Sequence, residues 1–293
     1  MHTPLMLSRP YPVHALEPSC RFVAAVTAHW REYLMEVLQL GVLMLCICLA
    51  GALTYGVESP LRRFPLPLIA RSFLMGVLVA TGTYFIIRSP YGRRTGAHLN
   101  PAITVSYFWL GRIHRWDAAV YVVAQFVGGL LGVFAAYQIL GRHLSAPPVQ
   151  FVVTLPGDYG RIAAFVAEFL LSAVLMGAVL YTTNHRRLTR FSPFFVALIT
   201  VSSYVLSTSI SGFSVNPARS FSSAFFAWIW QGIWIYFAAP CLGMLAAAAI
   251  YIRLMGSDGV YCAKVFHDLE SPCPFPCRFH ELMANADETA PAS

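Results

Sequence analysis

The chain has 293 residues, of which 57% are hydrophobic and only 11% are charged, and its formal net charge at pH 7 is +7. Soluble domains carry charges at roughly a quarter of their positions, so this composition excludes an ordinary soluble domain and indicates an integral membrane protein. The basic residues separate apolar blocks and do not cluster among aromatic side chains. We therefore expect no nucleic-acid partner.

Six apolar segments are long enough to cross a membrane, since a hydrocarbon layer about 30 Å thick requires about 20 helical residues. In chain order they span residues 33–55, 66–87, 117–140, 161–182, 193–211 and 231–252. Two further apolar segments, 101–111 and 217–229, are much shorter, and each begins at the Pro of an Asn-Pro-Ala sequence. Segments this short are tolerated at membrane depth only where protein or a water-filled cavity covers them, so we expect two re-entrant half-helices.

The Lys and Arg residues are distributed unevenly between the loops. If the N-terminus is cytoplasmic, 14 of the 20 lie in inner segments and Arg219 lies in a half-length segment. The outer segments hold the other five: Arg62, Arg63, Arg71, Arg142 and Arg161. The positive-inside rule therefore predicts that both termini are cytoplasmic.

The order of the segments indicates an inverted repeat. One Asn-Pro-Ala sequence follows the second long segment on the inner side, and the other follows the fifth on the outer side, which is a plan found in transport proteins. The predicted fold is an all-α membrane protein with six transmembrane helices and two half-helices. We expect an N-terminal tail at 1–30, a channel domain at 31–255 with halves at about 31–140 and 161–255, and a C-terminal tail at 256–293.

The two Asn-Pro-Ala sequences are typical of helix starts, because Asn is a preferred N-cap and Pro is favoured at the first helical position. A helix N-terminus carries about half a positive charge. Two that meet near the midplane would repel cations and protons, while the Asn amides offer donors to a neutral solute. The residues concerned are Asn100, Pro101, Ala102, Asn216, Pro217 and Ala218.

Each half also contains a single carboxylate near the start of a long segment, Glu36 and Glu168. An ionisable group there is costly and needs a partner. We expect both to accept hydrogen bonds from loop amides beside the half-helices, and we expect Gln125 to act in the same way. A proton-relay role is the alternative.

With these features the sequence resembles the aquaporins of the major intrinsic protein family. The resemblance covers residues 31–255 and rests on "GAHLNPAITV", "GFSVNPARSF", Glu36, Gln125 and Glu168. It implies that Asn100 and Asn216 meet at the centre of a pore, and that the protein is a homotetramer with one pore in each subunit. It also implies a pore lining formed by the residues before each Asn, namely Gly96, Ala97, His98, Leu99, Gly212, Phe213, Ser214 and Val215.

Arg219 resembles the Arg of the family's outer constriction, where it donates hydrogen bonds and adds a positive barrier. Matching by offset from the two Asn residues gives Tyr204, Phe213 and Ala80 as the other constriction positions, with Thr81 as the alternative to Ala80.

The features that bear on the solute point in two directions. Phe213 resembles glycerol facilitators, and a small residue at position 80 would widen the pore. The residues that resemble the water-conducting branch of the family are Ser220, Ala224, Tyr236 and Phe237. We predict a water channel, and facilitation of glycerol, hydrogen peroxide or ammonia is the alternative.

The C-terminal tail holds candidate metal ligands at short spacing: Cys273, Cys277 and His280, with His267 or Cys262 able to complete a set of four. A structural zinc site is one hypothesis, and reduced, unliganded thiols are the other. A metal or redox gate built on this tail is a weaker hypothesis. No other cofactor is expected, and the last ten residues are expected to be disordered.

Two other classes of function share some of these features. An intramembrane enzyme would need a nucleophile elbow, an "HExxH" helix or a nucleotide-binding loop, and the chain contains none of these motifs. We therefore predict that it is not an enzyme. A secondary transporter shares the inverted-repeat plan, so it remains an alternative. The short loops suggest a bacterial inner membrane.

Overall fold

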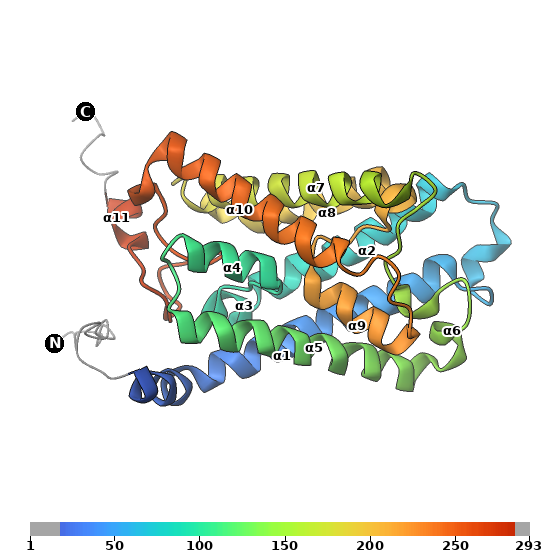
Figure 1. Cartoon of the computed structure of the whole chain (residues 1–293), viewed down its shortest axis with the longest axis horizontal. Helices are drawn as coiled ribbons and strands as arrows, with labels where there is room; N and C mark the ends of the chain where they lie inside the picture. Colours follow the sequence, from blue (N-terminus) through green and yellow to red (C-terminus); the bar gives the residue numbers. More distant parts are fainter. Residues whose placement is uncertain (1–17, 285–293) are drawn as a thin grey trace.

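The computed structural model describes residues 18–284, and within that range its regular secondary structure is entirely helical. The long helices lie side by side along the longest axis of the molecule (Figure 1). They are α1 Pro18–Tyr55, α2 Leu68–Arg88, α5 Arg115–Leu140, α7 Gly160–Thr183, α8 Ser192–Ser211 and α10 Ile235–Met255. Each is long and apolar enough to cross a membrane. The predicted all-α class with six spans is confirmed.

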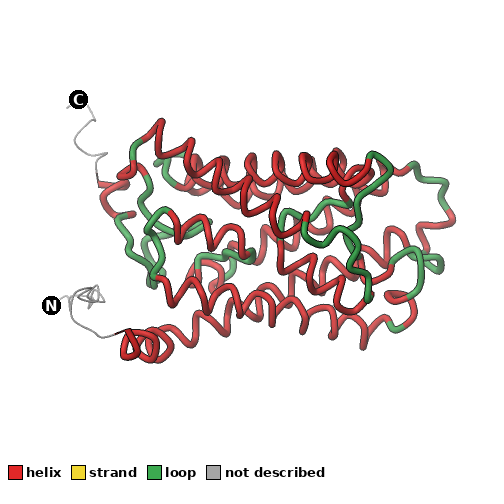
Figure 2. Tube along the Cα trace, viewed as in Figure 1, coloured by secondary structure: helices red, strands yellow, loops and turns green. Residues whose placement is uncertain are grey.

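The remaining helices are short, and Figure 2 shows the loops that join them near the middle and the ends of the bundle. They are α3 Pro90–Thr95, α4 Pro101–Trp109, α6 Arg142–Ser145, α9 Pro217–Ala227 and α11 Phe279–Ala284. Single 3-10 turns occur at η1 Pro60–Arg63, η2 Gln150–Val152, η3 Thr189–Phe191 and η4 Ser257–Gly259. The half-helices α4 and α9 lie in opposite halves of the bundle, on either side of its middle (Figure 1). The end at which α11 lies is called the tail end below.

Helix α1 begins well before the apolar segment that predicted it. Its first part, after Pro18, is too polar to be recognised as a span, and it bends at His29, where φ is −118° and ψ is 15°. Asp117 in the first turn of α5 fixes this bend, because its Oδ1 lies 2.8 Å from His29 Nδ1 and accepts the Tyr33 hydroxyl at 2.6 Å. The extension is therefore held by a side-chain contact that the hydropathy pattern does not reveal. The predicted tail at 1–30 falls partly outside the described residues.

The two halves pack by the same scheme. Helix α1 packs on α5, α7 packs on α10, and α2 packs on α8 across the halves. Small residues bring each pair together. A Cβ on Gly132 of α5 would lie 2.2 Å from the carbonyl oxygen of Gly41, and one on Gly243 of α10 would lie 2.2 Å from that of Phe169. Helix association in lipid relies on such close backbone approach, so both contacts need glycine.

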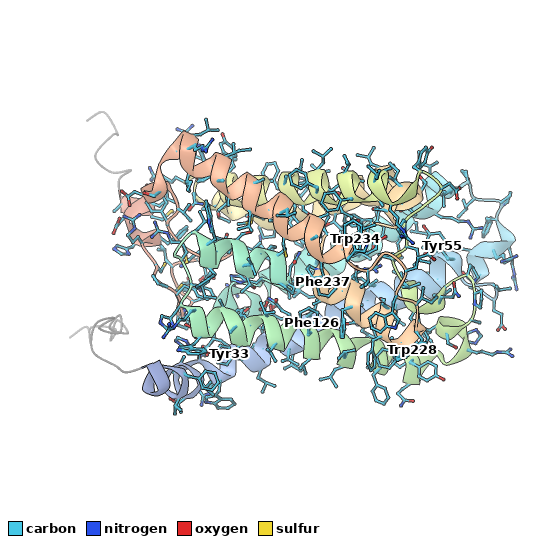
Figure 3. All side chains as sticks on the ribbon, in the orientation of Figure 1. Tyr33, Tyr55, Phe126, Trp228, Trp234 and Phe237 are labelled. Carbon is cyan, nitrogen blue, oxygen red and sulfur yellow. The ribbon has the colours of Figure 1, made fainter. Side chains whose placement is uncertain are left out.

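The outside of the bundle is strongly apolar. Large side chains on the spanning helices are more than half exposed, among them Leu38, Ile139, Ile162, Leu206 and Ile250. Figure 3 shows side chains projecting outward along the bundle, with Trp228 and Trp234 on the connection between α9 and α10. Tryptophan is enriched where a membrane meets water. This surface suits a lipid environment around the helices and an interfacial band at the end opposite the tail end.

Candidate functional site

The two half-helices start at the middle of the molecule, and each is capped by the Asn of its Asn-Pro-Ala sequence. Asn100 Oδ1 accepts the amide of Ala102 at 2.9 Å. Asn216 Oδ1 accepts the amides of Ala218 at 3.1 Å and Arg219 at 3.3 Å. Capping occupies the carbonyl oxygen of each side chain, so the amide group of each Asn is turned away from its own helix.

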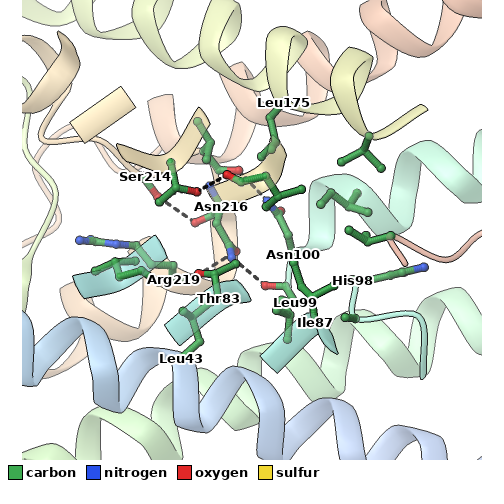
Figure 4. A pocket seen from close by; sticks show the side chains of 18 of the residues that line it. Leu43, Thr83, Ile87, His98, Leu99, Asn100, Leu175, Ser214, Asn216 and Arg219 are labelled. Carbon is green, nitrogen blue, oxygen red and sulfur yellow. Dashed lines mark hydrogen bonds between the residues drawn. The ribbon is translucent and has the colours of Figure 1, made fainter. Parts of the chain in front are cut away.

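The two Asn side chains also join the halves to each other. Asn100 Nδ2 donates to the carbonyl oxygen of Val215 at 2.7 Å, and Asn216 Nδ2 donates to that of Leu99 at 2.7 Å (Figure 4). Each amide group has two N–H bonds, and this exchange uses one. The second is available to a molecule in the cavity that both side chains line.

The loops that lead into the two Asn residues have the same unusual backbone. Left-handed φ values occur four, three and one residues before each Asn: at Gly96, Ala97 and Leu99, and at Gly212, Phe213 and Val215. Left-handed conformations are unfavourable for residues other than glycine, at about 1–3 kcal/mol each. The surrounding structure must therefore hold both loops in place.

Glu36 holds the first loop from α1. Its Oε1 accepts the amide of Leu99 at 2.5 Å and the Gln125 side chain at 2.9 Å. Gln125 in turn donates to the Thr104 hydroxyl at 3.1 Å. The sequence had suggested that Gln125 accepts a hydrogen bond from a loop amide, and the structure shows that it does not. It orients Glu36 and links it to α4.

Glu168 holds the second loop from the equivalent place on α7. Its Oε1 accepts the Ser211 hydroxyl at 2.7 Å and the Ser214 amide at 3.0 Å, and its Oε2 accepts the Val215 amide at 2.6 Å. Both oxygens are used here, so the second loop is bound more tightly to its carboxylate than the first.

A narrow cavity of about 90 Å³ runs past the joined helix starts. Besides the two Asn residues, the predicted lining residues that border it are Ala97, His98, Leu99, Tyr204, Phe213, Ser214, Val215 and Arg219. Gly96 and Gly212 only start the loops, and the Pro and Ala residues are buried in the first turns of α4 and α9. Much of the remaining wall is apolar, with Leu43, Leu175 and Val179 among its side chains. The site therefore offers a few fixed polar groups in an apolar channel.

The prediction for Ala80 is wrong. Ala80 is buried but does not border the cavity, and Thr81, the alternative, is exposed on another face of α2. Val79 and Thr83 line the cavity from this helix. The chain between position 80 and Asn100 is not one continuous helix, because α2 ends at Arg88 and α3 is a separate helix of six residues, so a fixed offset does not carry over. Sequence matching could not detect this break without knowing where α2 ends.

Three predicted constriction residues do gather beyond Asn216. The rings of Tyr204 and Phe213 meet edge to face with centroids 4.7 Å apart. Arg219 is buried, and its Nη1 donates to the carbonyl oxygen of Val152 at 2.8 Å. The turn η2 presents this carbonyl, and its three residues, Gln150, Phe151 and Val152, all have left-handed φ values. The guanidinium is thus positioned by a loop that sequence analysis had not singled out.

The C-terminal tail covers the cavity at the tail end. The Val265 amide donates to the carbonyl oxygen of Gly96 at 2.9 Å, and the Ser192 hydroxyl donates to that of Val265 at 2.7 Å. His98 Nε2 lies 2.6 Å from the carbonyl oxygen of Ala263. Val265 itself borders the cavity and is 1% exposed. No periodicity or motif in the tail predicts this contact, because it depends on where the chain returns after α10.

The tail also brings four of the five predicted metal ligands together. The ligand atoms of Cys262, His267, Cys273 and Cys277 all lie within 4.8 Å of one another. His280 is exposed on α11 and does not join them, because it follows Cys277 onto the outer face of that helix. The expected disorder of the last ten residues concerns positions that lie almost wholly outside the described range.

One ion pair ties the tail to the end of the bundle. Asp268 Oδ2 lies 3.1 Å from Arg93 Nη1. Partial burial opposes ionisation of Asp268, but hydrogen bonds from Ser271 and the charge of Arg93 keep the pKa of this carboxyl below its ordinary value. The aspartate is therefore a carboxylate under ordinary conditions.

Six apolar spans around two half-helices, joined at their capped starts beside a narrow cavity, define a membrane channel. The chain belongs to the major intrinsic protein family, whose model matches residues 22–251. It is an integral membrane channel of the aquaporin and aquaglyceroporin class, which conducts water or small solutes, and it is not an enzyme.

Relatives agree with this assignment. The chain is 26% identical over 228 residues to Aquaporin Z of Photorhabdus laumondii subsp. laumondii, covering 75% of this chain and 95% of the relative. It is 31% identical over 201 residues to the probable aquaporin TIP4-1 of Oryza sativa subsp. japonica, covering 68% and 74%. Among solved structures, the aquaglyceroporin from Plasmodium falciparum has the same fold, with a TM-score of 0.62, 20% identity, and coverage of 79% of this chain and 98% of that one.

Proposed function

We propose that the protein is a passive water channel that excludes ions and protons. The observation that carries this proposal is the reciprocal pair formed by Asn100 and Asn216 at the abutting starts of α4 and α9, beside an otherwise largely apolar cavity. Water accepts one hydrogen bond from each amide as it passes. The apolar wall offers it little else, so it is not retained.

Ion exclusion follows from the charges around that pair. The N-terminal ends of two helices and the buried guanidinium of Arg219 all place positive charge beside the cavity. A cation or hydronium ion entering it would be repelled, and it would lose hydration that an apolar wall does not replace.

The wall near Arg219 supports water as the principal solute. Tyr204 and Phe213 pack edge to face and border the cavity together with the guanidinium, which leaves an aromatic, positively charged passage. The similarity to proteins named aquaporin points the same way. Facilitation of glycerol or another small neutral solute is the second candidate, because Phe213 gives the passage an apolar surface on which a carbon chain can pack.

The buried carboxylates have a structural role in this proposal. Glu36 and Glu168 accept hydrogen bonds from loop amides and from neighbouring side chains, and these bonds hold the strained loops. A proton relay would need a chain of exchangeable groups leading away from each carboxylate. The donors to Glu36 are amides, which are not such groups. Glu168 also accepts the Ser211 hydroxyl, which lies 2.6 Å from the Ser207 hydroxyl, and we assign this pair to support of the second loop.

The setting of the channel is inferred from charge and from relatives. The excess of Lys and Arg in the segments on one side of the predicted topology supports a cytoplasmic location for the tail end and both termini. Similarity to Aquaporin Z of Photorhabdus laumondii supports a bacterial inner membrane. The exposed apolar faces of the helices suit both lipid and the neighbouring subunits of a homotetramer, and nucleic acid is not a partner.

Stopped-flow light scattering of proteoliposomes tests the proposal. Water permeability should exceed that of empty liposomes with a low activation energy and without saturation, and glycerol should pass more slowly. A saturable rate with a steep temperature dependence would indicate a carrier instead. Rates are measured before and after exposure to a metal chelator, because the tail covers one end of the cavity.

The exclusion of ions has its own test. Arg219→Val removes the guanidinium beside the cavity, so proton leakage and glycerol entry should both rise several-fold while water permeability is retained. Proton flux is followed with a pH-sensitive dye trapped in the vesicles. Leakage that stays at the unmodified level would remove Arg219 from the proposed barrier.

A further inference from the structure

We propose that the C-terminal tail binds one Zn²⁺ through Cys262, His267, Cys273 and Cys277, and that this metal holds the tail as a stopper across the tail end of the pore. The stopper rests on the proposed channel function. The metal site does not, because it is argued from the tail alone.

The spacing of the four ligand atoms suits tetrahedral zinc. With Zn–S at about 2.3 Å and Zn–N at about 2.0 Å, two sulfurs on one zinc lie about 3.8 Å apart, and a sulfur and a nitrogen lie about 3.5 Å apart. Cys262 Sγ lies 3.4 Å from Cys273 Sγ, and His267 Nε2 lies 3.1 Å from Cys277 Sγ. All four atoms lie within 4.8 Å of one another. Small shifts of the side chains would surround a zinc ion.

The histidine is oriented as a zinc ligand. His267 Nδ1 faces the backbone carbonyl oxygen of Asp268, which can only accept a hydrogen bond. Nδ1 must therefore carry the proton, which leaves the lone pair of Nε2 directed at the cysteines. A backbone partner of this kind is the usual support for a metal-binding imidazole. The ring also stacks on Phe279 with centroids 4.2 Å apart, which fixes its plane.

The charge balance around the cluster favours thiolates bound to a divalent cation. Three thiolates and one Zn²⁺ have a net charge of 2 − 3 = −1. Lys264 is fully buried, and its Nζ donates to the carbonyl oxygens of Arg93 and of Pro272, the residue before Cys273. Among the described residues this ammonium group has no carboxylate within 4.0 Å. A zinc centre with one negative charge would be its counter-ion.

The ligands enclose the segment that closes the pore. Cys262 and His267 lie immediately before and after residues 263–266, the segment that contacts the first Asn-Pro-Ala loop. Within it, the carbonyl oxygen of Ala263 lies in hydrogen-bond contact with His98 Nε2. The amide of Val265 donates to the carbonyl oxygen of Gly96. One metal bound on both sides of this segment would fix its two ends at once.

The second pair of ligands encloses another pore contact. Between Cys273 and Cys277, the ring of Phe275 stacks on His98 with centroids 5.4 Å apart and an angle of 13° between the planes. A Cβ on Gly96 would lie 3.0 Å from this ring. The tail therefore fits closely against the loop that leads to Asn100. Zinc binding and closure of the pore depend on the same folded tail, since residues 256–284 contain little other regular structure.

Metal content is measured first. Full-length protein purified in reductant should contain one zinc per chain, and Cys273→Ser with Cys277→Ser should lose most of it. Cys46→Ser with Cys241→Ser, which changes two cysteines in spanning helices, should keep it. Cobalt exchanged into the wild type should give thiolate charge-transfer and tetrahedral absorption bands. Protein without bound metal, or with a Cys262–Cys273 disulfide in its place, would overturn the site.

Water permeability tests the stopper in the same proteoliposomes. A membrane-permeant chelator should raise the permeability of the wild type several-fold, and added zinc should reverse the increase. The tail variant should be open from the start and insensitive to both reagents. Because the chelator acts on the unaltered sequence, a variant that folds poorly does not decide the result.

The outcomes separate the two proposals. Bound zinc with permeability that is the same before and after chelation, and well above that of empty liposomes, would overturn the stopper. Background permeability in the wild type, the chelated protein and the tail variant alike would instead overturn the channel function, and the stopper with it. The metal content would still stand as measured.

Discussion

In both halves of the molecule the same three features support a half-helix: an Asn cap, left-handed residues at fixed offsets before it, and a buried glutamate from the first helix of that half. The halves differ outside this centre. The second loop faces Tyr204 and Arg219, while the first loop faces the returning C-terminal tail. The repeat thus builds the centre twice, and elements outside the repeat make the two ends different.

Because the two halves are alike at the centre, we expect substitution of either Asn to lower water permeability strongly and by a similar factor. Asn100→Asp and Asn216→Asp each remove the donor that joins the halves and add an anion at the helix starts. Each should lower water permeability more than tenfold in chelator-treated proteoliposomes. Membrane insertion and detergent-extracted yield serve as controls. A large loss in only one of the two would show that the halves are not equivalent at the centre.

Substituting the two glutamates should lower the stability of the protein by different amounts. Glu168 accepts two loop amides and Glu36 accepts one, and leaving a buried amide without a partner costs about 1–3 kcal/mol. Glu168→Ala should therefore lower the apparent Tm in detergent more than Glu36→Ala does. The Gln variants keep one acceptor oxygen and should lie between. Equal shifts for the two Ala variants would argue against loop support as the difference between them.

The glycines that begin the two loops sharpen the comparison further. Gly96 and Gly212 both have positive φ, so Ala at either position is strained. At Gly96 the new Cβ would also meet Phe275 and Lys264 of the tail, whereas at Gly212 it would meet the backbone of Leu155 at 3.3 Å.

Only Gly96→Ala should therefore displace the tail. It should raise water permeability before chelation, whereas Gly212→Ala should leave it level or lower it. Stopped-flow rates of the two variants in untreated proteoliposomes provide the measurement. A rise in both would mean that strain in the loops, and not the tail, controls the rate.

The smallest effect is expected at the ion pair between Arg93 and Asp268. Both side chains are partly exposed, and such pairs contribute about 0–1 kcal/mol. Arg93→Gln should shift the chelator concentration needed for half-maximal opening by less than about fivefold, which corresponds to about 1 kcal/mol. A larger shift would mean that this ion pair, and not only the metal, holds the tail closed over the pore.

Local patterns were sufficient to predict much of the fold. Span length and hydropathy located the six long helices, and Asn followed by Pro located the starts of α4 and α9, because capping acts between residues close in the chain. Counting from Asn100 failed at Ala80, because an offset holds only while the intervening chain keeps one helical geometry. The end of α2 at Arg88 and the separate helix α3 break that condition.

The amino-acid sequence by itself determined a membrane protein built as an inverted repeat with two capped half-helices, since hydropathy, charge bias and capping are properties of short segments. Only the tertiary structure decided which side chains border the cavity, that η2 positions Arg219, and that His267 joins the three tail cysteines while His280 does not. These contacts join residues far apart in the chain. Their formation depends on how the helices pack and where the tail returns, which no local pattern specifies.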